Sequence, residues 1–459
     1  MSDEGPPPRA AKQAERRLES VPEASRKARP DDRFFEPDIE TMPRTWIATR
    51  QEQRILELVP YAYERSALVR KKWDEAGVKP ADIGSLADFS ERAPFITKDD
   101  IRQFRDQAGD PFGGLMCARY SDATTVFSTS GTTGDATLYA HAWDRWHPFW
   151  AATARDLWEI GVRPGDYVLG SGFKMRGPLY HADQMCGAIP LMVNTGVGGW
   201  ATALDAIRRY RPVYATLTGL AVAELDHLSR SHDMTDIFSS FKGVSFAGEP
   251  LGARARRQLS SWGLEVYVWT STGDVTAAFE CGEHDGCHAW EDCVLLEAVD
   301  PAGTAPVADG ELGELVATSL DNLITPMVRF RSDDIIRMTT QPCACGRTHA
   351  RFWPVGRKGD ETIVAGHSFV PMDIWRALEQ VPETATALFQ LVRPAREIDE
   401  LKVRVGYDPE LTSSVPDVRD RVSEAITAAV GVAPVLELLP EPDLLARGRG
   451  GKLPRVVKV

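Results

Sequence analysis

A short loop of small residues is the segment whose residue types most directly predict chemistry. Ser128-Thr-Ser-Gly-Thr-Thr-Gly134 follows the β-branched run Thr124-Thr-Val-Phe127. Glycines let the backbone approach a ligand closely, so that several N–H groups and hydroxyls point at one anion. The pattern predicts a phosphate-binding loop, although the same composition also suits a surface turn. It is not a Walker A motif, because that motif ends in Gly-Lys-Ser/Thr.

Cysteine and histidine residues gather in two segments that lie far apart in the sequence. Cys281 and His284 are three residues apart, and Cys343 and Cys345 form a later Cys-x-Cys pair. Sulfur and nitrogen ligands from two hairpins suit a tetrahedral structural Zn²⁺ site. The alternative is a group of free thiols with surface histidines. Two further residues compete as ligands, so the set stays open: Cys287 and His288.

One lysine lies in a glycine-rich segment near the end of the sequence, Gly450-Gly-Lys-Leu-Pro-Arg-Val-Val457. Taken alone, Lys452 is better explained as a solvated surface lysine, because lysine is mostly an exposed residue. Its interpretation therefore depends on the segments around it.

Further segments follow one another in an order typical of a known family. In sequence order they are Phe246-Ala-Gly-Glu-Pro-Leu251, Cys281–His288 with Leu296–Pro301, Gly310–Ser319, Met327–Asp334, Cys343–Arg347, Gly356-Arg-Lys-Gly-Asp360 and the Gly-Lys segment. With the loop at 128–134, these segments make the chain resemble the adenylate-forming acyl/aryl-acid ligases from about residue 40 onward. The closest likeness is to the phenylacetate–CoA ligase-like branch.

The resemblance implies a two-step reaction. A carboxylate, expected to be aromatic, attacks the α-phosphate of ATP to give an acyl-adenylate and pyrophosphate, and a thiol then displaces AMP. The resemblance gives catalytic roles to Lys452 and Thr272, a Mg²⁺ contact to Asp274 and a hinge to Gly359. It also implies an ATP- and AMP-binding set made of Ser128, Thr129, Ser130, Gly131, Thr132, Thr133, Gly134, Ala247, Gly248, Glu249, Pro250, Thr270, Ser271, Asp334 and Arg357.

The acid pocket is expected between the main sheet and the nucleotide. Aromatic side chains offer apolar surface for stacking a ring, although most of the 12 tryptophans are expected simply to fill the core. The expected lining residues are Phe173, Tyr180, His181, Gly198, Trp200 and Trp269.

The sequence departs from the family pattern at positions that bear on catalysis. Gly273 stands where the family carries a glutamate, and Asp274 follows it as a substitute carboxylate. Mg²⁺ requires near-ideal geometry, so this shift affects metal affinity. Asp135 and Ala136 replace the Lys-Pro that usually continues the phosphate loop. These changes suggest a specialised member, from secondary metabolism.

Three functional hypotheses follow. The leading one is an acid–CoA ligase that uses ATP, Mg²⁺ and coenzyme A. The second keeps the adenylation step but transfers the acyl group to an amine, an acyl carrier protein or another nucleophile. The third is an inactive nucleotide-binding scaffold, suggested by Gly273 and Asp135 and opposed by the retention of Lys452 and Asp334. The resemblance also suggests a homodimer.

Composition limits the other possibilities. The chain has 459 residues with 43% hydrophobic and 26% charged residues, typical of a globular protein. Its formal net charge of −13 argues against nucleic acid or an anionic membrane as partner, since these select basic surfaces. No apolar run reaches the ~20 residues needed to span a bilayer. The N-terminal segment lacks the apolar core of a secretion signal, and 7 cysteines are too few for a disulfide scaffold. We expect a cytoplasmic, reduced protein.

The elements that position these residues follow from local patterns. Short β-branched runs alternate with helix-like segments from about residue 120, which predicts an α/β sheet covered by helices. Apolar spacing over 50–77 predicts one helix, and strand-like runs from residue 294 predict a small β subdomain. The expected organisation is a disordered arm over 1–30, an N-terminal adenylation domain of several subdomains over 31–358, and a small mobile α+β C-terminal domain over 359–459.

Overall fold

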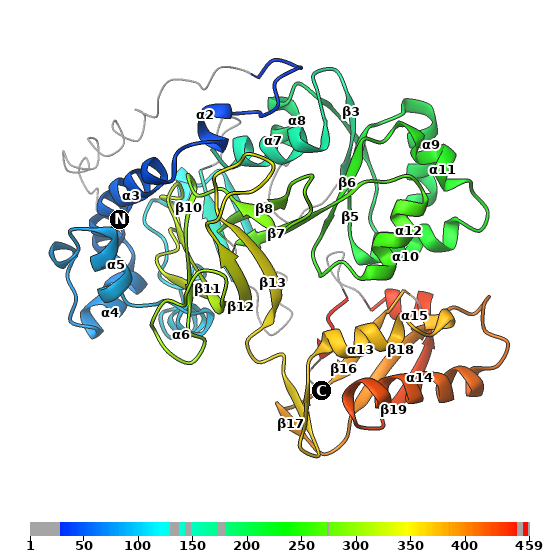
Figure 1. The fold of residues 1–459 in the computed structure, drawn as a ribbon. Coiled ribbons are helices and arrows are strands. Elements are labelled where there is room, and N and C mark those ends of the chain that lie inside the picture. The colour runs from blue at the N-terminus through cyan, green and yellow to red at the C-terminus, as the bar shows by residue number, and fades with distance from the viewer. Residues whose placement is uncertain are drawn as a thin grey trace.

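The computed structural model describes residues 28–128, 137–142, 148–171, 180–272, 275–384, 386–447 and 453–457. The arm expected over 1–30 therefore lies almost wholly outside the described residues. Within the described ranges, the alternation of strands and helices confirms the predicted α/β class (Figure 1). No helix among these residues has the length and apolar character needed to cross a bilayer.

A sheet of 11 strands forms the centre of the larger part of the molecule, in the order β10-β11-β12-β13-β9-β8-β7-β6-β5-β3-β4. The half that ends at β4 is parallel, because each pair from β7 to β4 runs in the same direction. Its strands are β3 (Tyr167–Ser171), β4 (Ile189–Val193), β5 (Tyr214–Leu217), β6 (Gly243–Ala247) and β7 (Val266–Thr272).

Helices cover both faces of this parallel half, and the strand sequences show why. Side chains alternate between the two faces of a strand, and in β5 Leu217 packs in one core cluster while Tyr214 packs in another. The Leu217 face is covered by α9 (Trp200–Tyr210), α10 (Gly219–Leu228), α11 (Met234–Ile237) and α12 (Ala253–Ser261). The Tyr214 face is covered by α7 (Pro148–Ile160) and α8 (Tyr180–Met185). Parallel sheets are normally buried on both faces in this way.

The other half of the sheet is antiparallel. These strands, expected to form a small β subdomain, are joined to the parallel half through the β7–β8 pair. They are β8 (Thr276–Glu280), β9 (Cys287–Ala289), β10 (Val294–Val299), β11 (Leu312–Ser319), β12 (Phe330–Thr339) and β13 (Arg351–Arg357). A two-stranded sheet of β1 (Thr125–Ser128) and β2 (Leu138–His141) lies apart from them.

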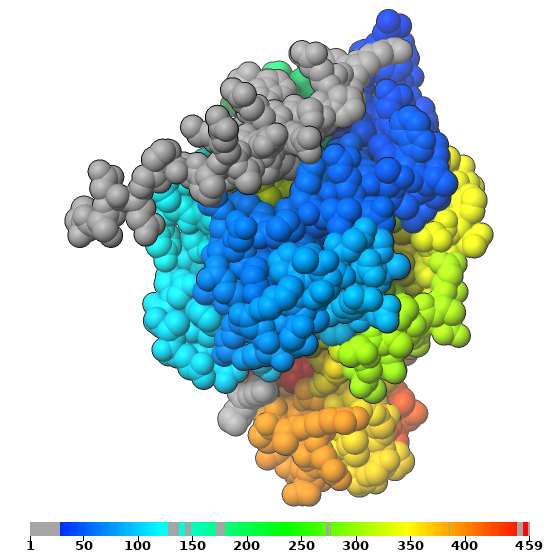
Figure 2. Space-filling view, turned by 90° about the vertical axis from the view of Figure 1, so that its left-hand side faces the viewer, coloured from blue at the N-terminus to red at the C-terminus, as the bar shows by residue number. Residues whose placement is uncertain are grey.

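The N-terminal helices pack against β10–β12 and share one core with them (Figure 1; Figure 2 shows their outer face in blue). The helix predicted over 50–77 is two helices, because Ser66 adopts an extended backbone and its side chain accepts a hydrogen bond from the Val69 N–H, which begins a new helix. The helices of this core are α3 (Arg44–Arg65), α4 (Ala67–Glu75), α5 (Leu86–Arg92) and α6 (Lys98–Ala108). A short helix, α2 (Pro37–Glu40), precedes them.

The C-terminal block after β13 has its own hydrophobic core and its own sheets, and it forms a separate lobe in Figures 1 and 2. A four-stranded sheet has the order β19-β18-β16-β20, and a three-stranded sheet has the order β15-β14-β17. The elements are β14 (Thr362–Val364), β15 (His367–Phe369), α13 (Pro371–Leu378), β16 (Phe389–Val392), β17 (Glu397–Ile398), β18 (Lys402–Tyr407), α14 (Val415–Val430), β19 (Val435–Pro440), α15 (Glu441–Leu445) and β20 (Val456–Val457).

Candidate active site and metal cluster

The predicted nucleotide residues on β6 and β7 meet at one edge of the sheet. The two strands are parallel neighbours, and Ala247 at the end of β6 lies opposite Trp269. The chain then turns at Gly248, whose φ of 101° favours glycine, while β7 continues through Thr270 and Ser271. Ligands of open α/β sheets bind beyond the carboxyl ends of parallel strands. The fold therefore presents this group of residues where a nucleotide is expected.

Glu249, in the turn after β6, is held by a residue from the C-terminal block. Its Oε2 accepts hydrogen bonds from Arg455 Nε at 3.0 Å and Nη2 at 2.7 Å. Both side chains are largely buried, with exposures of 9% for Glu249 and 14% for Arg455. Glu249 Oε1 is also buried and has no hydrogen-bond partner among the described residues. This ion pair is an addition to the nucleotide-binding role expected for Glu249 from the sequence.

Asp334 and Arg357, expected at the ribose, are brought together by the pairing of β12 with β13. They lie opposite each other in the antiparallel register, and Arg357 Nε is 3.1 Å from Asp334 Oδ1. Their side chains are 32% and 36% exposed, so both remain accessible to a ligand. The Arg357 Nη2 also donates to the Ser332 carbonyl at 3.1 Å, which fixes the guanidinium beside the carboxylate.

Two predicted acid-pocket residues lie together at the start of α8. The rings of Tyr180 and His181 are 4.5 Å apart between centroids, and His181 is 5.7 Å from the ring of Trp150 on α7. The Nδ1 of His181 is buried and has no hydrogen-bond partner among the described residues. The pair therefore offers an aromatic surface and one unused polar atom.

The other described acid-pocket residues lie on β7 and at the start of α9. Trp200, the first residue of α9, is fully buried in the core, and its backbone N–H donates to Glu224 Oε1 at 3.0 Å. Gly198 donates its N–H to the other carboxylate oxygen at 2.8 Å. Trp269 is half-buried beside the core on the α7 face. The pocket roles of these three residues stay predictions.

Several predicted residues cannot be placed. Ser128 ends β1 and Thr272 ends β7, but their side chains are not described. The remaining predicted residues lie outside the described ranges: Thr129, Ser130, Gly131, Thr132, Thr133, Gly134, Phe173, Asp274 and Lys452.

The predicted hinge residue, Gly359, lies two residues after the end of β13. Its φ is 83°, in the left-handed region that glycine adopts readily, and its carbonyl accepts a hydrogen bond from Arg393 at 2.8 Å. Burial raises the pKa of the neighbouring Asp360 carboxyl, and the charges of Arg357 and Arg393 oppose this rise.

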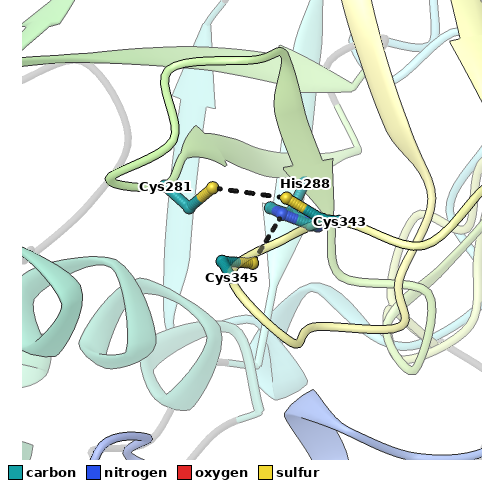
Figure 3. Close-up of side chains that lie close together, drawn as sticks. All are labelled: Cys281, His288, Cys343 and Cys345. Atoms are coloured by element: carbon teal, nitrogen blue, oxygen red, sulfur yellow. Dashed lines mark hydrogen bonds between the residues drawn. The ribbon is translucent and has the colours of Figure 1, made fainter.

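Four buried side chains form a cluster with the composition of a metal site: Cys281, His288, Cys343 and Cys345 (Figure 3). Cys281 follows β8, His288 lies on β9, and the other two lie in the turn between β12 and β13. Pairing of β9 with both β8 and β13 brings these segments together. The four ligand atoms all lie within 4.8 Å of one another.

Two distances in this cluster are close to those expected between the ligands of a tetrahedral ion. Tetrahedral Zn–S bonds of ~2.3 Å and Zn–N bonds of ~2.0 Å place neighbouring ligand atoms roughly 3.5 to 3.8 Å apart. The Cys281 and Cys343 sulfurs are 3.8 Å apart, and Cys345 Sγ lies 3.4 Å from His288 Nε2. The other ring nitrogen of His288 faces the His349 carbonyl at 3.2 Å, an outer contact typical of metal-bound histidine. Hydrogen bonds from Cys281 and His288 lower the pKa of the Cys345 thiol.

The assignment of His284 as the fourth ligand is corrected by this geometry. Its two ring nitrogens lie 3.1 Å from Glu280 Oε2 and 2.5 Å from Glu265 Oε1, so both already face carboxylates. Cys287, the other competitor, precedes His288 on β9 and faces the opposite side, where its sulfur lies 3.9 Å from the Val268 carbonyl. The alternation of β9 is the sequence signal that separates Cys287 from His288.

A buried group of charges connects this cluster to the N-terminal segment, and the sequence analysis missed it. The backbone N–H of Arg347 donates to Cys345 Sγ at 3.4 Å. Its guanidinium pairs with Glu40 and Glu159, each at 2.8 Å, with both carboxylates almost fully buried. It also lies 5.0 Å from the centre of the Phe34 ring. The turn that carries Cys343 and Cys345 therefore contacts both α2 and α7.

Comparisons with known proteins agree with this architecture. A search against models of protein families finds no match. Among curated proteins, the chain is 30% identical to a phenylacetate–coenzyme A ligase from Thermus thermophilus over 451 residues, covering 92% of this chain and 99% of that protein. The fold and the grouped residues thus define an adenylate-forming, AMP-forming acid–CoA ligase.

Solved structures give the same answer. The chain matches 2-hydroxyisobutyryl-CoA ligase in its postadenylation state, with an adenylate bound, at a TM-score of 0.81 and 26% identity, covering 95% of this chain and 94% of that one. It matches the same ligase in the thioesterification state at a TM-score of 0.67 and 27% identity, covering 94% and 93%. The chain belongs to the phenylacetate–coenzyme A ligase family.

Proposed function

We propose that this ligase activates an aromatic carboxylic acid and transfers it to coenzyme A. The observation that carries the proposal is the joining of the Ala247–Glu249 turn with the end of β7 at the carboxyl edge of the parallel strands. The alignment with a phenylacetate–coenzyme A ligase, which covers 92% of this chain, supports the same function. Tyr180 and His181 supply aromatic surface beside α7.

The reaction has two balanced steps. A carboxylate oxygen of the acid attacks the α-phosphorus of ATP, the bond to the bridging oxygen breaks, and pyrophosphate leaves. The thiol of coenzyme A then attacks the acyl carbon, its proton is lost, and AMP leaves with the electron pair of the acyl–oxygen bond.

The predicted binding and catalytic residues each have a role in this proposal. The loop from Ser128 to Gly134 binds the β- and γ-phosphates through N–H groups and hydroxyls. Asp334 accepts hydrogen bonds from the ribose hydroxyls, with Arg357 beside it. Lys452 stabilises the charge that develops between carboxylate and α-phosphate. Thr272 and Asp274 complete the site, where Mg²⁺ when bound neutralises phosphate charge.

Domain movement is part of the proposal. Residues 31–358 and 359–459 act as two units that rotate relative to each other between the two steps. The backbone at Gly359 absorbs this rotation, because glycine adopts both positive and negative φ values readily. An acyl carrier protein as the acceptor and assembly as a homodimer remain predictions. Both can be tested on the purified protein.

The cluster of Cys281, His288, Cys343 and Cys345 is proposed to hold a structural Zn²⁺. The support is the donor set, the burial of all four residues and the ligand spacing. A closed set of four protein ligands leaves no position for a substrate, so the ion has a structural role.

The test is pyrophosphate release with ATP and Mg²⁺ across a panel of aromatic and aliphatic acids, followed by thioester formation on adding coenzyme A. We expect release that depends on an aromatic acid and is lost in Lys452→Ala, with Lys402→Ala, an exposed lysine of β18, as the matched control. Release with aliphatic acids alone would contradict the proposed substrate class. Silence across the panel in a protein that still binds ATP would favour the inactive scaffold.

A further inference from the structure

The contact between the C-terminal block and the large part of the molecule is centred on Arg455. Besides its two hydrogen bonds to Glu249, its Nη1 donates to the Ala387 carbonyl at 2.7 Å. Its Cζ lies 4.1 Å from the ring centre of Trp375 and 5.1 Å from that of Phe389. One guanidinium thus joins the turn after β6 to three residues of the C-terminal block.

The backbone of Arg455 is fixed in the C-terminal sheet. Its carbonyl accepts a hydrogen bond from the Leu391 N–H at 2.7 Å, and the next residue, Val456, begins the pairing of β20 with β16. Leu453 packs in a small core with Leu220 and Ala223 of α10, which belong to the large part. The segment that follows Lys452 is therefore anchored to both parts of the molecule.

The surfaces around this ion pair approach each other very closely. A Cβ added at Gly252, in the large part, would overlap Trp375 of α13 and Glu379, which directly follows α13. Glu379 Oε1 accepts hydrogen bonds from Trp375 Nε1 at 3.0 Å and from the Arg254 N–H at 3.3 Å. A second ion-pair group, Arg230 with Asp408 and Glu410, lies elsewhere on the same interface. These contacts form together in one relative position of the two parts.

That arrangement agrees with one step of the reaction. The chain superposes on 2-hydroxyisobutyryl-CoA ligase with a TM-score of 0.81 in the postadenylation state and 0.67 in the thioesterification state. The interface formed by Arg455 therefore belongs to the arrangement that resembles the state following adenylation in that relative.

We propose that Arg455 is a positioning residue for adenylate formation, holding the C-terminal block against the turn at Glu249 during that step. The inference rests on the proposed function, and adds that this ion pair opens before coenzyme A reacts. Only two residues separate Arg455 from Lys452, so anchoring one limits the reach of the other. Because Glu249 is also in the turn assigned to the nucleotide, one element couples nucleotide binding to the position of the block.

The first experiment separates the two half-reactions. Adenylation is followed as acid-dependent pyrophosphate release, and the second step as thioester formation from supplied acyl-adenylate and coenzyme A. For Arg455→Ala we expect kcat of adenylation to fall roughly 10- to 100-fold, since a buried charged hydrogen bond is lost. The rate from supplied acyl-adenylate stays within about twofold of the unchanged protein, because that step does not use the closed interface.

Two variants make this result specific. Arg455→Lys keeps the charge and one donor, so it restores part of the adenylation rate. Arg404→Ala removes an arginine that pairs at 2.7 Å with Glu437 inside the C-terminal block and leaves both half-reactions unchanged. Equal slowing of both half-reactions by Arg455→Ala, or slowing of neither, would overturn the proposal.

A second measurement does not depend on activity. Spin labels on Asp205→Cys in α9 and Glu424→Cys in α14 report the distance between the two parts, and all seven native cysteines are buried. We expect Arg455→Ala to broaden or shift the main distance, and Arg404→Ala to leave it unchanged. An unaltered distance in Arg455→Ala would refute the interface role even if the panel of acids found no substrate. Absence of pyrophosphate release in the unchanged protein would instead count against the proposed function.

Discussion

His284 and His288 lie four positions apart and differ in what surrounds them. His288 Nε2 faces Cys345, whereas both nitrogens of His284 face carboxylates. Replacing His288 by Ala removes one of four ligands, and we expect zinc affinity to fall by at least tenfold. His284→Ala should retain one zinc per chain. Metal analysis after dialysis against a weak chelator measures the difference.

Cys287→Ala is the matched control for this prediction, because Cys287 adjoins His288 but faces the other side of β9. It should bind zinc like the unchanged protein. Loss of zinc from His284→Ala with retention by His288→Ala would contradict the ligand set.

At this scale the sequence indicated three of the four cluster residues and left His288 as one alternative to His284 for the fourth. The Cys-x-Cys pair and Cys281 were recognisable by residue type and spacing. The choice between His284 and His288 depended on which residues of the segment form β9, and on carboxylates that come from Glu265 and Glu280. Similarly, Arg455 belonged to a recognised segment, but its partner Glu249 is over two hundred positions away, and local patterns do not report such pairs.

At the scale of the elements, α8 carries a buried carboxyl group that makes stability depend on pH. Burial raises the pKa of Asp183 to about 7, above the ~3.9 of an unfolded aspartate. Its contribution to stability is therefore full below pH ~4 and is lost as the pH rises through 7. Asp183→Asn does not titrate, so its melting temperature should rise relative to the unchanged protein between pH 5 and pH 8. The difference in unfolding free energy reaches at most roughly 4 kcal/mol, at about 1.4 kcal/mol for each pH unit.

Thermal unfolding at fixed ionic strength checks this prediction. Asp205→Asn on α9 is the control, because its side chain is 80% exposed, and its effect should be the same at both pH values. A constant difference between Asp183→Asn and the unchanged protein across this range would show that the Asp183 carboxyl does not titrate there.

Most elements of the parallel half were predictable, because buried strands and amphipathic helices leave periodic patterns. The run Val266–Trp269 lies inside β7, and the segment 201–210 lies inside α9. The joining of the antiparallel strands to the same sheet was not predictable, since it depends on the β7–β8 pairing and not on the sequence of either strand. The break at Ser66 was missed because the apolar period continues across it.

At the scale of the whole molecule, the cluster proposed to hold Zn²⁺ lies beside residues that contact the N-terminal segment. Arg347 adjoins the cluster and pairs with Glu40, while the Thr348 hydroxyl donates to the Met42 carbonyl at 2.6 Å. Removing the metal should therefore release residues 34–42 as well as the ligand turns. We expect amide exchange over 34–42 to accelerate at least tenfold after chelation, measured by hydrogen exchange with mass spectrometry.

The helix α14 serves as the internal reference, because it lies in the core of the C-terminal block. Its exchange should not change, and adding Zn²⁺ back should restore protection over 34–42. Faster exchange confined to 281–288 and 343–345 would show that the cluster does not support the N-terminal segment.

The close approach at Gly252 also constrains how this protein can diverge. Any side chain at position 252 would overlap Trp375 and Glu379. A larger residue there is tolerated only when α13 changes at the same time, so these positions must vary together. In chimaeras that exchange C-terminal blocks between relatives, the two sides of the interface are therefore expected to pack poorly unless Gly252, Trp375 and Glu379 come from one parent.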